Sequence, residues 1–373
     1  MNICILGCGM QGRVIAWDLA KAGHNVKVLD SNHKNFKNLK NLPNIETKKF
    51  DVRERQKLVK LLKKFDVVVG ALPSSLGFYS MQCAVDAGID MVDISYLPED
   101  PFKLDKIARI KKVKIVPDAG FAPGLSNILI GEAYEKLKPI DTIKILAGGI
   151  PQNPVPPFNY RITWSSADLI EEYLRPARIR KNFRTVKVDS LSGIEEFDLK
   201  KIGTFECFYT DGLRTLLKTF KDIRSMEEKT IRYPGHVVIF KEMIDRGFFS
   251  EKPLKFFTLN TTAKEITLKG LQKILSKGDE KDMSILIVEL TSLARPYRGQ
   301  IKRYTCIDYY DEKNKITSMA RMTGYTCSII TQCIKDYPGF GIIPPEYLGM
   351  DKNICSFIKQ ELKKRAIQIK SQK

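Results

Sequence analysis

The fold of this chain is decided by the stretch Gly7-Cys8-Gly9-Met10-Gln11-Gly12. The stretch follows an apolar run at residues 3–6 and precedes a helix-like segment at residues 13–22, so a strand, a glycine turn and a helix succeed one another. In the pattern Gly-x-Gly-x-x-Gly, the first glycine allows the tight turn, the second lets a pyrophosphate approach the backbone, and the third lets the helix pack closely on the strand. The free N–H groups of the helix then face the phosphates. The stretch therefore predicts a dinucleotide-binding site.

An acidic residue follows at the distance that such sites require. A second apolar strand, at residues 25–29, ends in Asp30, 18 residues after Gly12, and folds of this kind place an acid about 20 residues beyond the glycines, on the adenosine ribose. A carboxylate accepts hydrogen bonds from the ribose hydroxyls and repels a 2′-phosphate, so Asp30 favours NAD over NADP. If NADP were preferred, the expected phosphate pocket would be Asn32, His33 and Lys34.

Further cofactor contacts are expected where the following strands end, because parallel strands of a doubly wound sheet bind their ligand at the carboxyl edge. These strands are expected at residues 45–51, 65–73, 91–94 and 112–116. Asp51 ends the first of them and is either an adenine contact or the N-cap of the next helix. The predicted cofactor-binding residues are Gly7, Gly9, Met10, Gln11, Gly12, Asp30, Ser31, Asp51, Val52, Ala71, Leu72, Pro73 and Asp93.

Length and composition indicate a globular chain of two domains. The 373 residues can bury a large core, and 43% of them are hydrophobic and 28% charged. No apolar run approaches the ~20 residues that span a bilayer, and no basic and apolar leader precedes the first strand, so we expect a cytoplasmic protein without membrane contact. The eight cysteines are scattered and there are only three histidines, a pattern that favours reduced thiols and no metal site.

The net charge of +19 raises the question of a nucleic-acid partner. The lysines recur in several separate segments, mostly on the polar sides of expected helices, without the interleaved aromatic residues of a single-strand groove. We therefore expect a lysine-rich solvated surface and no nucleic-acid binding.

The expected fold class is α/β, with a Rossmann-type doubly wound parallel sheet and an inserted α+β second domain built on a mixed sheet. The glycine- and proline-rich loop 117–127 is the expected exit to the second domain. Beyond it we expect strands at 142–147 and 160–164, a turn at 148–151, and a final basic helix at 353–369. The expected boundaries are 1–123 for the NAD-binding domain, 124–318 for the substrate domain, and 319–373 for C-terminal helices that return to the first domain.

Two polar stretches of the second domain are suited to hold an amino-acid substrate. They are residues 209–214 and 230–236, and each carries an arginine, Arg214 or Arg232, whose planar fork binds a carboxylate through two hydrogen bonds. His236 can take the proton that leaves an amine or alcohol during oxidation, and Asp118, at the end of the sixth strand, is the alternative base. The structural alternatives are ion pairs for both arginines and a hydrogen-bonded core position for the histidine.

Six stretches spread over most of the chain resemble signature segments of the saccharopine dehydrogenase-like family. They are residues 7–12, 117–124, 148–151, 160–165, 209–216 and 229–236. Within that family the sequence is most similar to NAD-dependent lysine 6-dehydrogenases, on Gly-Gly-Ile-Pro at 148–151, Lys-Thr-Ile-Arg-Tyr-Pro-Gly-His at 229–236 and Met-Ala-Arg-Met-Thr-Gly-Tyr-Thr at 319–326. The resemblance implies substrate contacts at Tyr160, Trp164, Tyr209, Arg214 and Arg232, catalytic candidates His236 and Asp118, and a homodimer formed through the second domain.

The resemblance also implies an activity, oxidation of the ε-carbon C–N bond of L-lysine to a semialdehyde that cyclises. A saccharopine dehydrogenase, which acts on a secondary amine between lysine and a dicarboxylate, is the alternative within the family. The saccharopine-forming reductases carry a Tyr-Pro-Asn-Arg-type segment where this chain has Tyr209 to Arg214 with a different spacing. A catalytically silent NAD-binding protein is the alternative from another class.

Overall fold

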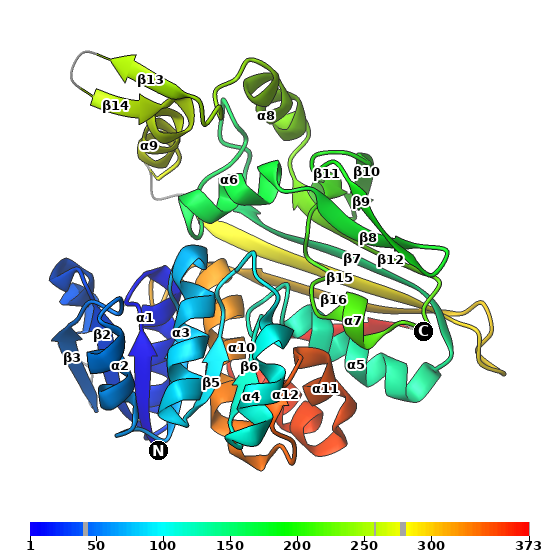
Figure 1. The fold of residues 1–373 in the computed structure, drawn as a ribbon. Coiled ribbons are helices and arrows are strands. Elements are labelled where there is room, and N and C mark those ends of the chain that lie inside the picture. The colour runs from blue at the N-terminus through cyan, green and yellow to red at the C-terminus, as the bar shows by residue number, and fades with distance from the viewer. Residues whose placement is uncertain (40–43, 257–258, 277–280, 373) are drawn as a thin grey trace.

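Two sheets organise the chain in the computed structural model, which describes residues 1–39, 44–256, 259–276 and 281–372 (Figure 1). Seven strands form the first sheet and nine form the second, and a separate two-stranded hairpin stands with α9 at one end of the second domain. No helix within the described residues is long and apolar enough to cross a membrane.

The first sheet is parallel and has the order β17-β6-β5-β4-β1-β2-β3. Its strands are β1 (Asn2–Leu6), β2 (Asn25–Asp30), β3 (Ile45–Lys49), β4 (Val67–Gly70), β5 (Asp90–Asp93), β6 (Lys114–Val116) and β17 (Gly341–Ile342). The chain moves outward from β1 to β3 and then returns to the other side of β1, so the strand order reverses between β1 and β4. Ligands of doubly wound sheets bind at this reversal, outside the carboxyl ends of the strands. The predicted Rossmann-type fold is confirmed.

Helices cover the first sheet. They are α1 (Met10–Lys21), α2 (Arg55–Leu62), α3 (Ser74–Ala87), α4 (Asp105–Ile110), α5 (Leu125–Leu137), α10 (Ser318–Cys333), α11 (Pro345–Met350) and α12 (Lys352–Lys364), with short 3₁₀ helices at His33–Leu39, Pro101–Leu104 and Ile334–Asp336. Late elements pack on early ones, since α10 lies against α1 and α11 against α5. The buried Asp18 of α1 accepts hydrogen bonds from Ser328 of α10 at 2.6 Å and from Arg365 at 2.8 Å. The C-terminal segment is thus part of the core of the first domain.

The second sheet is mixed and has the order β10-β11-β12-β7-β15-β16-β18, with β8 paired to β12 and β9 to β8. Its strands are β7 (Ile140–Pro151), β8 (Ala177–Lys181), β9 (Arg184–Val188), β10 (Glu195–Leu199), β11 (Gly203–Tyr209), β12 (Ser225–Arg232), β15 (Asp282–Ser292), β16 (Ile301–Tyr309) and β18 (Ile369–Gln372). The pairing of β12 with β7 is parallel and the other pairings are antiparallel. The remaining elements are α6 (Ser166–Leu174), α7 (Leu216–Thr219), α8 (His236–Asp245), β13 (Pro253–Phe256), β14 (Leu259–Thr262) and α9 (Ala263–Leu275).

Two local predictions in the second domain are wrong. The turn expected at residues 148–151 is the end of the long strand β7, where Gly148 and Gly149 pair with β15. A side chain is excluded at Gly148 because its Cβ would lie 2.6 Å from the Ile231 carbonyl oxygen, whereas a Cβ on Gly149 would displace the methyl end of Met319, 2.2 Å away. The strand expected at 160–164 is irregular backbone. Tyr160 and Thr163 are both buried, but they are three residues apart, so the burial does not follow the alternation of a strand.

The final helix is shorter than expected. It ends at Lys364, Ala366 adopts a left-handed φ of 61°, and the following residues form β18, which pairs with β16 of the second sheet. The segment 319–373 therefore does not consist of helices alone and does not return only to the first domain. The division at residues 123 and 124 stays a prediction.

A buried carboxyl joins the C-terminal segment to the base of the second domain. Glu346 of α11 is fully buried and accepts hydrogen bonds from Asn127 Nδ2 at 3.1 Å, Thr215 Oγ1 at 2.9 Å and Thr219 Oγ1 at 2.6 Å. These donors come from α5, from the residue that precedes α7, and from α7 itself. Burial raises the pKa of Glu346. The four groups form one polar joint inside the apolar core.

Replacement of Glu346 by alanine leaves the buried donors of Asn127 and Thr215 without this acceptor, whereas the half-buried Thr219 hydroxyl can still donate to the Thr215 carbonyl. Each unsatisfied buried donor costs about 1–3 kcal/mol, so we expect the free energy of unfolding to fall by about 2 kcal/mol or more. Urea denaturation measures this loss. The matched control is Glu135→Ala, whose exposed side chain pairs only with Lys138 and which should change the free energy by less than about 0.5 kcal/mol. Equal effects of the two variants would contradict the role of the joint.

Candidate functional site

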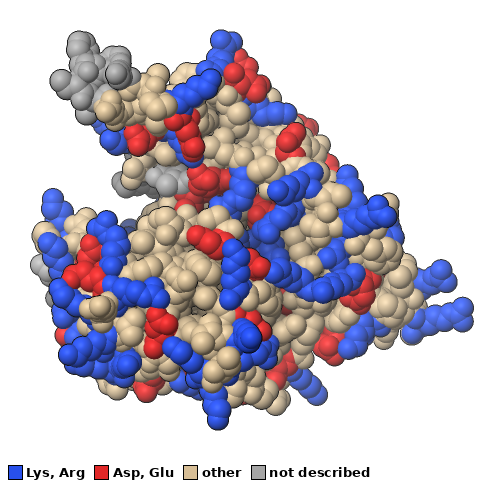
Figure 2. Space-filling view, in the orientation of Figure 1, with Lys and Arg blue, Asp and Glu red and all other residues tan. Residues whose placement is uncertain are grey.

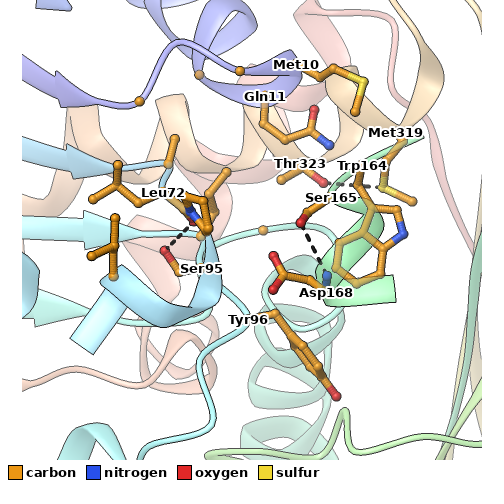
Figure 3. Close-up of a pocket in the computed structure, with 18 of the residues that line it drawn as sticks. Met10, Gln11, Leu72, Ser95, Tyr96, Trp164, Ser165, Asp168, Met319 and Thr323 are labelled. Carbon is orange, nitrogen blue, oxygen red and sulfur yellow. Dashed lines mark hydrogen bonds between the residues drawn. The ribbon is translucent and has the colours of Figure 1, made fainter. Parts of the chain in front are cut away.

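One cavity of about 700 Å³ runs from the carboxyl edge of the first sheet to the second domain. Its first wall is the glycine turn with the ends of β2, β3 and β4, and its second wall comes from β7, α6, β12 and α10. A deep notch separates the two domains at the left of the space-filling view (Figure 2). Figure 3 shows side chains from both domains around the cavity, among them Met10 and Gln11 of α1, Ser95 and Tyr96 after β5, and Trp164 before α6.

The glycine turn has the geometry of a pyrophosphate cradle. Gly7 has a φ of 100°, and its Cβ would lie 2.3 Å from the Ala71 carbonyl oxygen. A Cβ on Gly12 would lie 2.2 Å from the Gly7 carbonyl oxygen, whereas one on Gly9 would meet nothing within 4 Å. Helix α1 begins at Met10 without a side-chain cap, which leaves the N–H groups of its first turn available to an anion. These residues fit a dinucleotide.

Asp30 lies beside this cradle, and hydrogen bonds from neighbouring residues of the first domain fix its carboxylate. Its carboxylate accepts hydrogen bonds from the Cys8 amide at 2.7 Å, the Asn32 amide at 2.7 Å and Asn35 Nδ2 at 3.1 Å. Arg53 lies nearby in the same lining and pairs with Asp51 at 2.6 Å. Twelve of the predicted cofactor residues line the cavity. They are Gly7, Gly9, Met10, Gln11, Gly12, Asp30, Ser31, Asp51, Val52, Ala71, Leu72 and Pro73.

Asp93 is the one predicted cofactor residue that does not line the cavity. It is fully buried, and its Oδ1 accepts a hydrogen bond from the Ser95 amide at 2.7 Å. Burial raises its pKa to about 7. The carboxyl fills the space above Gly70, where a Cβ would lie 1.8 Å from Asp93 Oδ2. Asp93 therefore supports Ser95, which lines the cavity and donates a hydrogen bond to the Leu72 carbonyl at 3.1 Å (Figure 3).

Three side chains of the second wall come from alternate positions of β12. Glu228, Thr230 and Arg232 are two residues apart, so they point to the same face of the strand, and all three line the cavity. Beside them Gly148 and Gly149 of β7 leave the wall open, because neither carries a side chain. Helix α6 adds Asp168 and Glu172 to the same wall, and Trp164 precedes it. Figure 3 shows Trp164 near Met319, and the Trp164 ring meets that of Tyr96 edge-on, with 6.3 Å between the ring centroids.

Arg232 is held firmly within this wall. It is 2% exposed, donates from Nε to the Tyr173 hydroxyl at 2.9 Å and from Nη1 to the Ile231 carbonyl at 2.8 Å, and stacks 4.6 Å from the centre of the Tyr160 ring. Glu172 Oε2 lies 3.5 Å from its Nη2. Tyr160 is fully buried and packs behind the arginine, outside the cavity lining. The guanidinium is thus fixed in place with a surface that faces the cavity.

His236 is a core residue behind this arginine. It is fully buried, Nδ1 lies 2.8 Å from the Phe158 carbonyl and Nε2 2.8 Å from the Tyr173 hydroxyl, and it does not line the cavity. A carbonyl only accepts, so Nδ1 donates and Nε2 accepts from Tyr173. Burial lowers the pKa of His236 to about 3. The imidazole is therefore neutral and fixes Tyr173, which in turn fixes Arg232, and it does not itself contact the cavity.

Arg214 and Tyr209 also lie away from the cavity. Arg214 pairs with Asp118 at 3.0 Å, and both residues are buried and have left-handed φ values, 50° and 54°. Asp118 lines the cavity, but Arg214 Nε donates to both of its carboxylate oxygens at 3.2 and 3.3 Å. Tyr209 is on the other face of its sheet, where its hydroxyl donates to Glu227 at 3.1 Å. These contacts make Arg214 the partner of Asp118.

Several lining residues were not among the predicted site residues. They are Ser95, Tyr96, Asp168, Glu172, Thr210, Glu228, Thr230, Met319 and Thr323. The alternation Glu228, Thr230, Arg232 is a visible signal, because a strand that presents Arg232 to a site also presents the residues at i−2 and i−4. Glu172 and Met319 carry no such signal, since only the packing of α6 and α10 brings them to the cavity.

The described side chains also bear on whether a metal ion or a nucleic acid is a partner. No group of three or more His, Cys, Asp or Glu side chains in the described ranges is arranged to hold a metal ion. On the face seen in Figure 2, the Lys and Arg side chains are distributed over both domains with Asp and Glu among them. That distribution agrees with a solvated basic surface.

Comparison of the sequence with known proteins identifies two family matches and several related proteins. Residues 3–116 match the saccharopine dehydrogenase NADP binding domain, and residues 120–367 match the saccharopine dehydrogenase C-terminal domain. An alpha-aminoadipic semialdehyde synthase of Arabidopsis thaliana is 23% identical over 260 residues, which are 66% of this chain but 24% of that protein. The saccharopine dehydrogenase [NADP(+), L-glutamate-forming] of Schizosaccharomyces pombe is 20% identical over 86% of this chain and 87% of its own.

Solved structures agree on the fold. The apo saccharopine dehydrogenase (L-Glu forming) of Saccharomyces cerevisiae superposes with a TM-score of 0.77 at 19% identity and covers 100% of this chain and 99% of its own. The homospermidine synthase of Legionella pneumophila, in complex with NAD, gives a TM-score of 0.68 at 13% identity and covers 100% of this chain and 91% of its own. The two family matches follow one another over most of the chain, which therefore belongs to the saccharopine dehydrogenase family.

Proposed function

We propose that the protein is an NAD-dependent dehydrogenase that oxidises the C–N bond at the ε-carbon of L-lysine to a semialdehyde, which cyclises. One observation carries the proposal, the charge of the second wall. That wall presents three acids, Asp168, Glu172 and Glu228, and one arginine, Arg232. The other arginine of the described lining, Arg53, lies with Asp51 at the end of β3, on the cofactor side.

Lysine matches this pattern of charge. It has one carboxylate, for which Arg232 is the clamp, and two ammonium groups, which acids stabilise. Saccharopine has three carboxylates, and a site for it requires further cationic groups. The second wall carries acidic side chains where a saccharopine site would need cationic groups, and carboxylates repel one another. Lysine is therefore the substrate that the wall favours, and saccharopine is the alternative.

The chain contributes position and charge to the reaction. When bound, NAD accepts a hydride from the carbon that carries the nitrogen. The glycine turn would hold the pyrophosphate and Asp30 the adenosine ribose, and the same cavity continues to the second wall. Arg232, fixed through Tyr173 and His236, orients the substrate carboxylate, and the acids orient the amine. Orientation of this kind removes a large part of the entropic barrier.

The first prediction concerns the substrate. With NAD and L-lysine as the sole additions, we expect the absorbance of reduced cofactor to increase, and with saccharopine we expect at most a small fraction of that rate. The physical reason is that Arg232 is the one arginine that the second wall presents to a carboxylate, whereas saccharopine has three carboxylates. Parallel steady-state assays of both compounds with NAD and with NADP measure the difference. A higher kcat/KM for saccharopine than for lysine would replace the lysine proposal by its alternative.

The second prediction concerns Arg232. A hydrogen bond to a charged group contributes about 1.5–3 kcal/mol, so Arg232→Ala should raise the KM for the substrate about 10- to 100-fold. Arg232→Lys keeps the charge but loses the planar fork, and we expect an intermediate KM. The control is Arg246→Ala, which removes an exposed arginine of α8 that pairs with Glu242. Parental KM values in both Arg232 variants would make this arginine purely structural.

The third prediction concerns the cofactor. Asp30→Ala removes the charge that repels a 2′-phosphate, so we expect the ratio of the Kd for NADPH to that for NADH to decrease at least tenfold. Fluorescence titration of each reduced cofactor measures both constants, and it requires no substrate. Circular dichroism checks that loss of the hydrogen bonds to Cys8 and Asn32 leaves the fold intact. A parental protein that binds NADPH more tightly than NADH would contradict the assignment of NAD.

A further inference from the structure

Two acids of the second wall are connected by two threonines. Glu172 Oε1 lies 2.5 Å from Thr230 Oγ1, which lies 2.9 Å from Thr210 Oγ1, which lies 2.6 Å from Glu228 Oε2. All four residues line the cavity. They come from α6, from β12, and from the residue that follows β11. We call these four side chains the carboxyl row.

The carboxyl row requires a proton that the threonines do not supply. It contains three oxygen–oxygen contacts, and each hydrogen bond needs one hydrogen between its two oxygens. Each threonine hydroxyl donates only one, and an ionised carboxylate only accepts. Three hydrogen bonds therefore need a third hydrogen, and it has to be carried by one of the two carboxyl groups. Without it, two buried oxygens would face each other with no hydrogen between them.

The surroundings assign this hydrogen to Glu228. Glu228 is 5% exposed, and a Cβ on Gly212 would lie 2.5 Å from its carboxyl carbon, so Gly212 packs closely on the group. The charged groups that face it are the acids Glu172 of α6 and Asp211, and Asp211 is already paired with Arg178 at 2.7 Å. Burial, more than these charges, raises the pKa of Glu228 to about 8. Hydrogen bonds from Thr210 and from the Gly212 amide act in the opposite direction, but a pKa near 8 keeps most of the buried Glu228 carboxyl protonated at neutral pH.

Glu172 is the charged end of the row. Its Oε2 is buried and makes no hydrogen bond, and it lies 3.5 Å from Arg232 Nη2, a cation that stabilises the ionised form. Gln11 Oε1, from the opposite wall, is a second buried acceptor without a hydrogen-bond partner. Buried acceptors of this kind are almost always satisfied in folded proteins. Other buried oxygens without partners, such as Ser284 Oγ, lie away from the cavity, whereas Glu172 and Gln11 line it, so a ligand with N–H donors can reach these two.

We propose that Glu228 and Glu172 share a single proton through Thr210 and Thr230, and that this row makes Glu172 the group that binds the substrate ammonium and takes its proton. The inference rests on the proposed oxidation of an amine. In the step, an N–H bond of the ammonium breaks, the proton moves to Glu172 Oε2, and the electron pair stays on nitrogen. The substrate loses one positive charge and Glu172 loses one negative charge. Only the neutral amine has the lone pair that stabilises the carbon as it is oxidised.

The neutral state of Glu228 has a direct role in this step. A second negative charge beside the ammonium would stabilise the cation and oppose its deprotonation. Glu228 is accordingly a positioning residue: it donates along the row, orients both threonines and leaves one negative charge at Glu172. As the pH rises through the pKa of Glu228, near 8, the row loses its third hydrogen and this arrangement is lost.

Infrared spectroscopy of the full chain without substrate tests the proton count. At pH 6 Asp93, whose pKa is raised to about 7 by burial, also carries a proton and contributes a C=O band of its own. We expect a further carboxylic-acid C=O band that disappears only as the pH rises through about 8, and we expect this band to be absent in Glu228→Gln. The matched control is Glu227→Gln, on the opposite face of the same strand, where Glu227 contacts Tyr209. If the band remained in Glu228→Gln, or disappeared in Glu172→Gln instead, the assignment of the proton would be wrong. Should Glu228→Gln fail to fold, Thr210→Val breaks the row and must shift the band, and an unshifted band overturns the proposal.

Kinetics test the acceptor. Loss of a general base lowers turnover by about 10²–10⁴-fold, so we expect Glu172→Gln to lower kcat by that factor with the amine substrate. Glu228→Gln should remove the decline of kcat/KM near pH 8 that Glu227→Gln retains. An unchanged kcat in Glu172→Gln, or an unchanged pH profile in Glu228→Gln, overturns the proposal. Because the infrared band needs no substrate, its presence with no lysine oxidation refutes the proposed function and leaves the row intact, and lysine oxidation without the band refutes the row alone.

Discussion

The close approach of two backbone segments at the glycine turn is the constraint on which the cofactor cleft depends. Gly7 and Gly12 bring β1, α1 and the end of β4 so near that a Cβ at either position would lie 2.3 or 2.2 Å from a carbonyl oxygen. That contact fixes the start of α1, and with it the direction of the N–H groups that face the cavity. The ends of β2 and β3 follow from the parallel register with β1 and bring Asp30 and Asp51 to the same edge.

The second wall depends on a different kind of constraint, a set of buried polar groups that satisfy one another. Phe158, His236, Tyr173 and Arg232 form one hydrogen-bonded series, and the carboxyl row forms another beside it. In a low dielectric such groups are stable only when each donor has an acceptor. Two acceptors left free, Glu172 Oε2 and Gln11 Oε1, belong to residues that line the cavity, where a bound ligand can supply donors.

The sequence predicted the first domain well because its signals are local. The glycine spacing, the apolar strands and the terminal acid lie within residues 3–30, and no distant contact overrides them. In the second domain the decisive contacts are distant: the turn expected at Gly148 is a strand because β15 pairs with it, and Glu172 reaches the cavity only through the packing of α6. Residue type alone also assigned His236 to catalysis, whereas its two partners make it part of the core. The alternation of Glu228, Thr230 and Arg232 along one strand is a signal in the sequence, and the prediction used it only for Arg232.

The path of the backbone has a consequence for how the molecule holds together. Within the described residues, the chain passes from the first sheet to the second after β6, returns after β16 to form β17, and passes again to the second sheet to form β18. Three covalent crossings therefore link the two halves. A nick after β16 or after β17 leaves the first crossing intact, so both halves of the cleft stay on one fragment. A nick at the first crossing separates β1–β6 from the rest of the chain, and the two fragments are then held together by packing such as that of α10 against α1. The late return of the chain thus gives the protein a connection between its domains that does not depend on the first crossing.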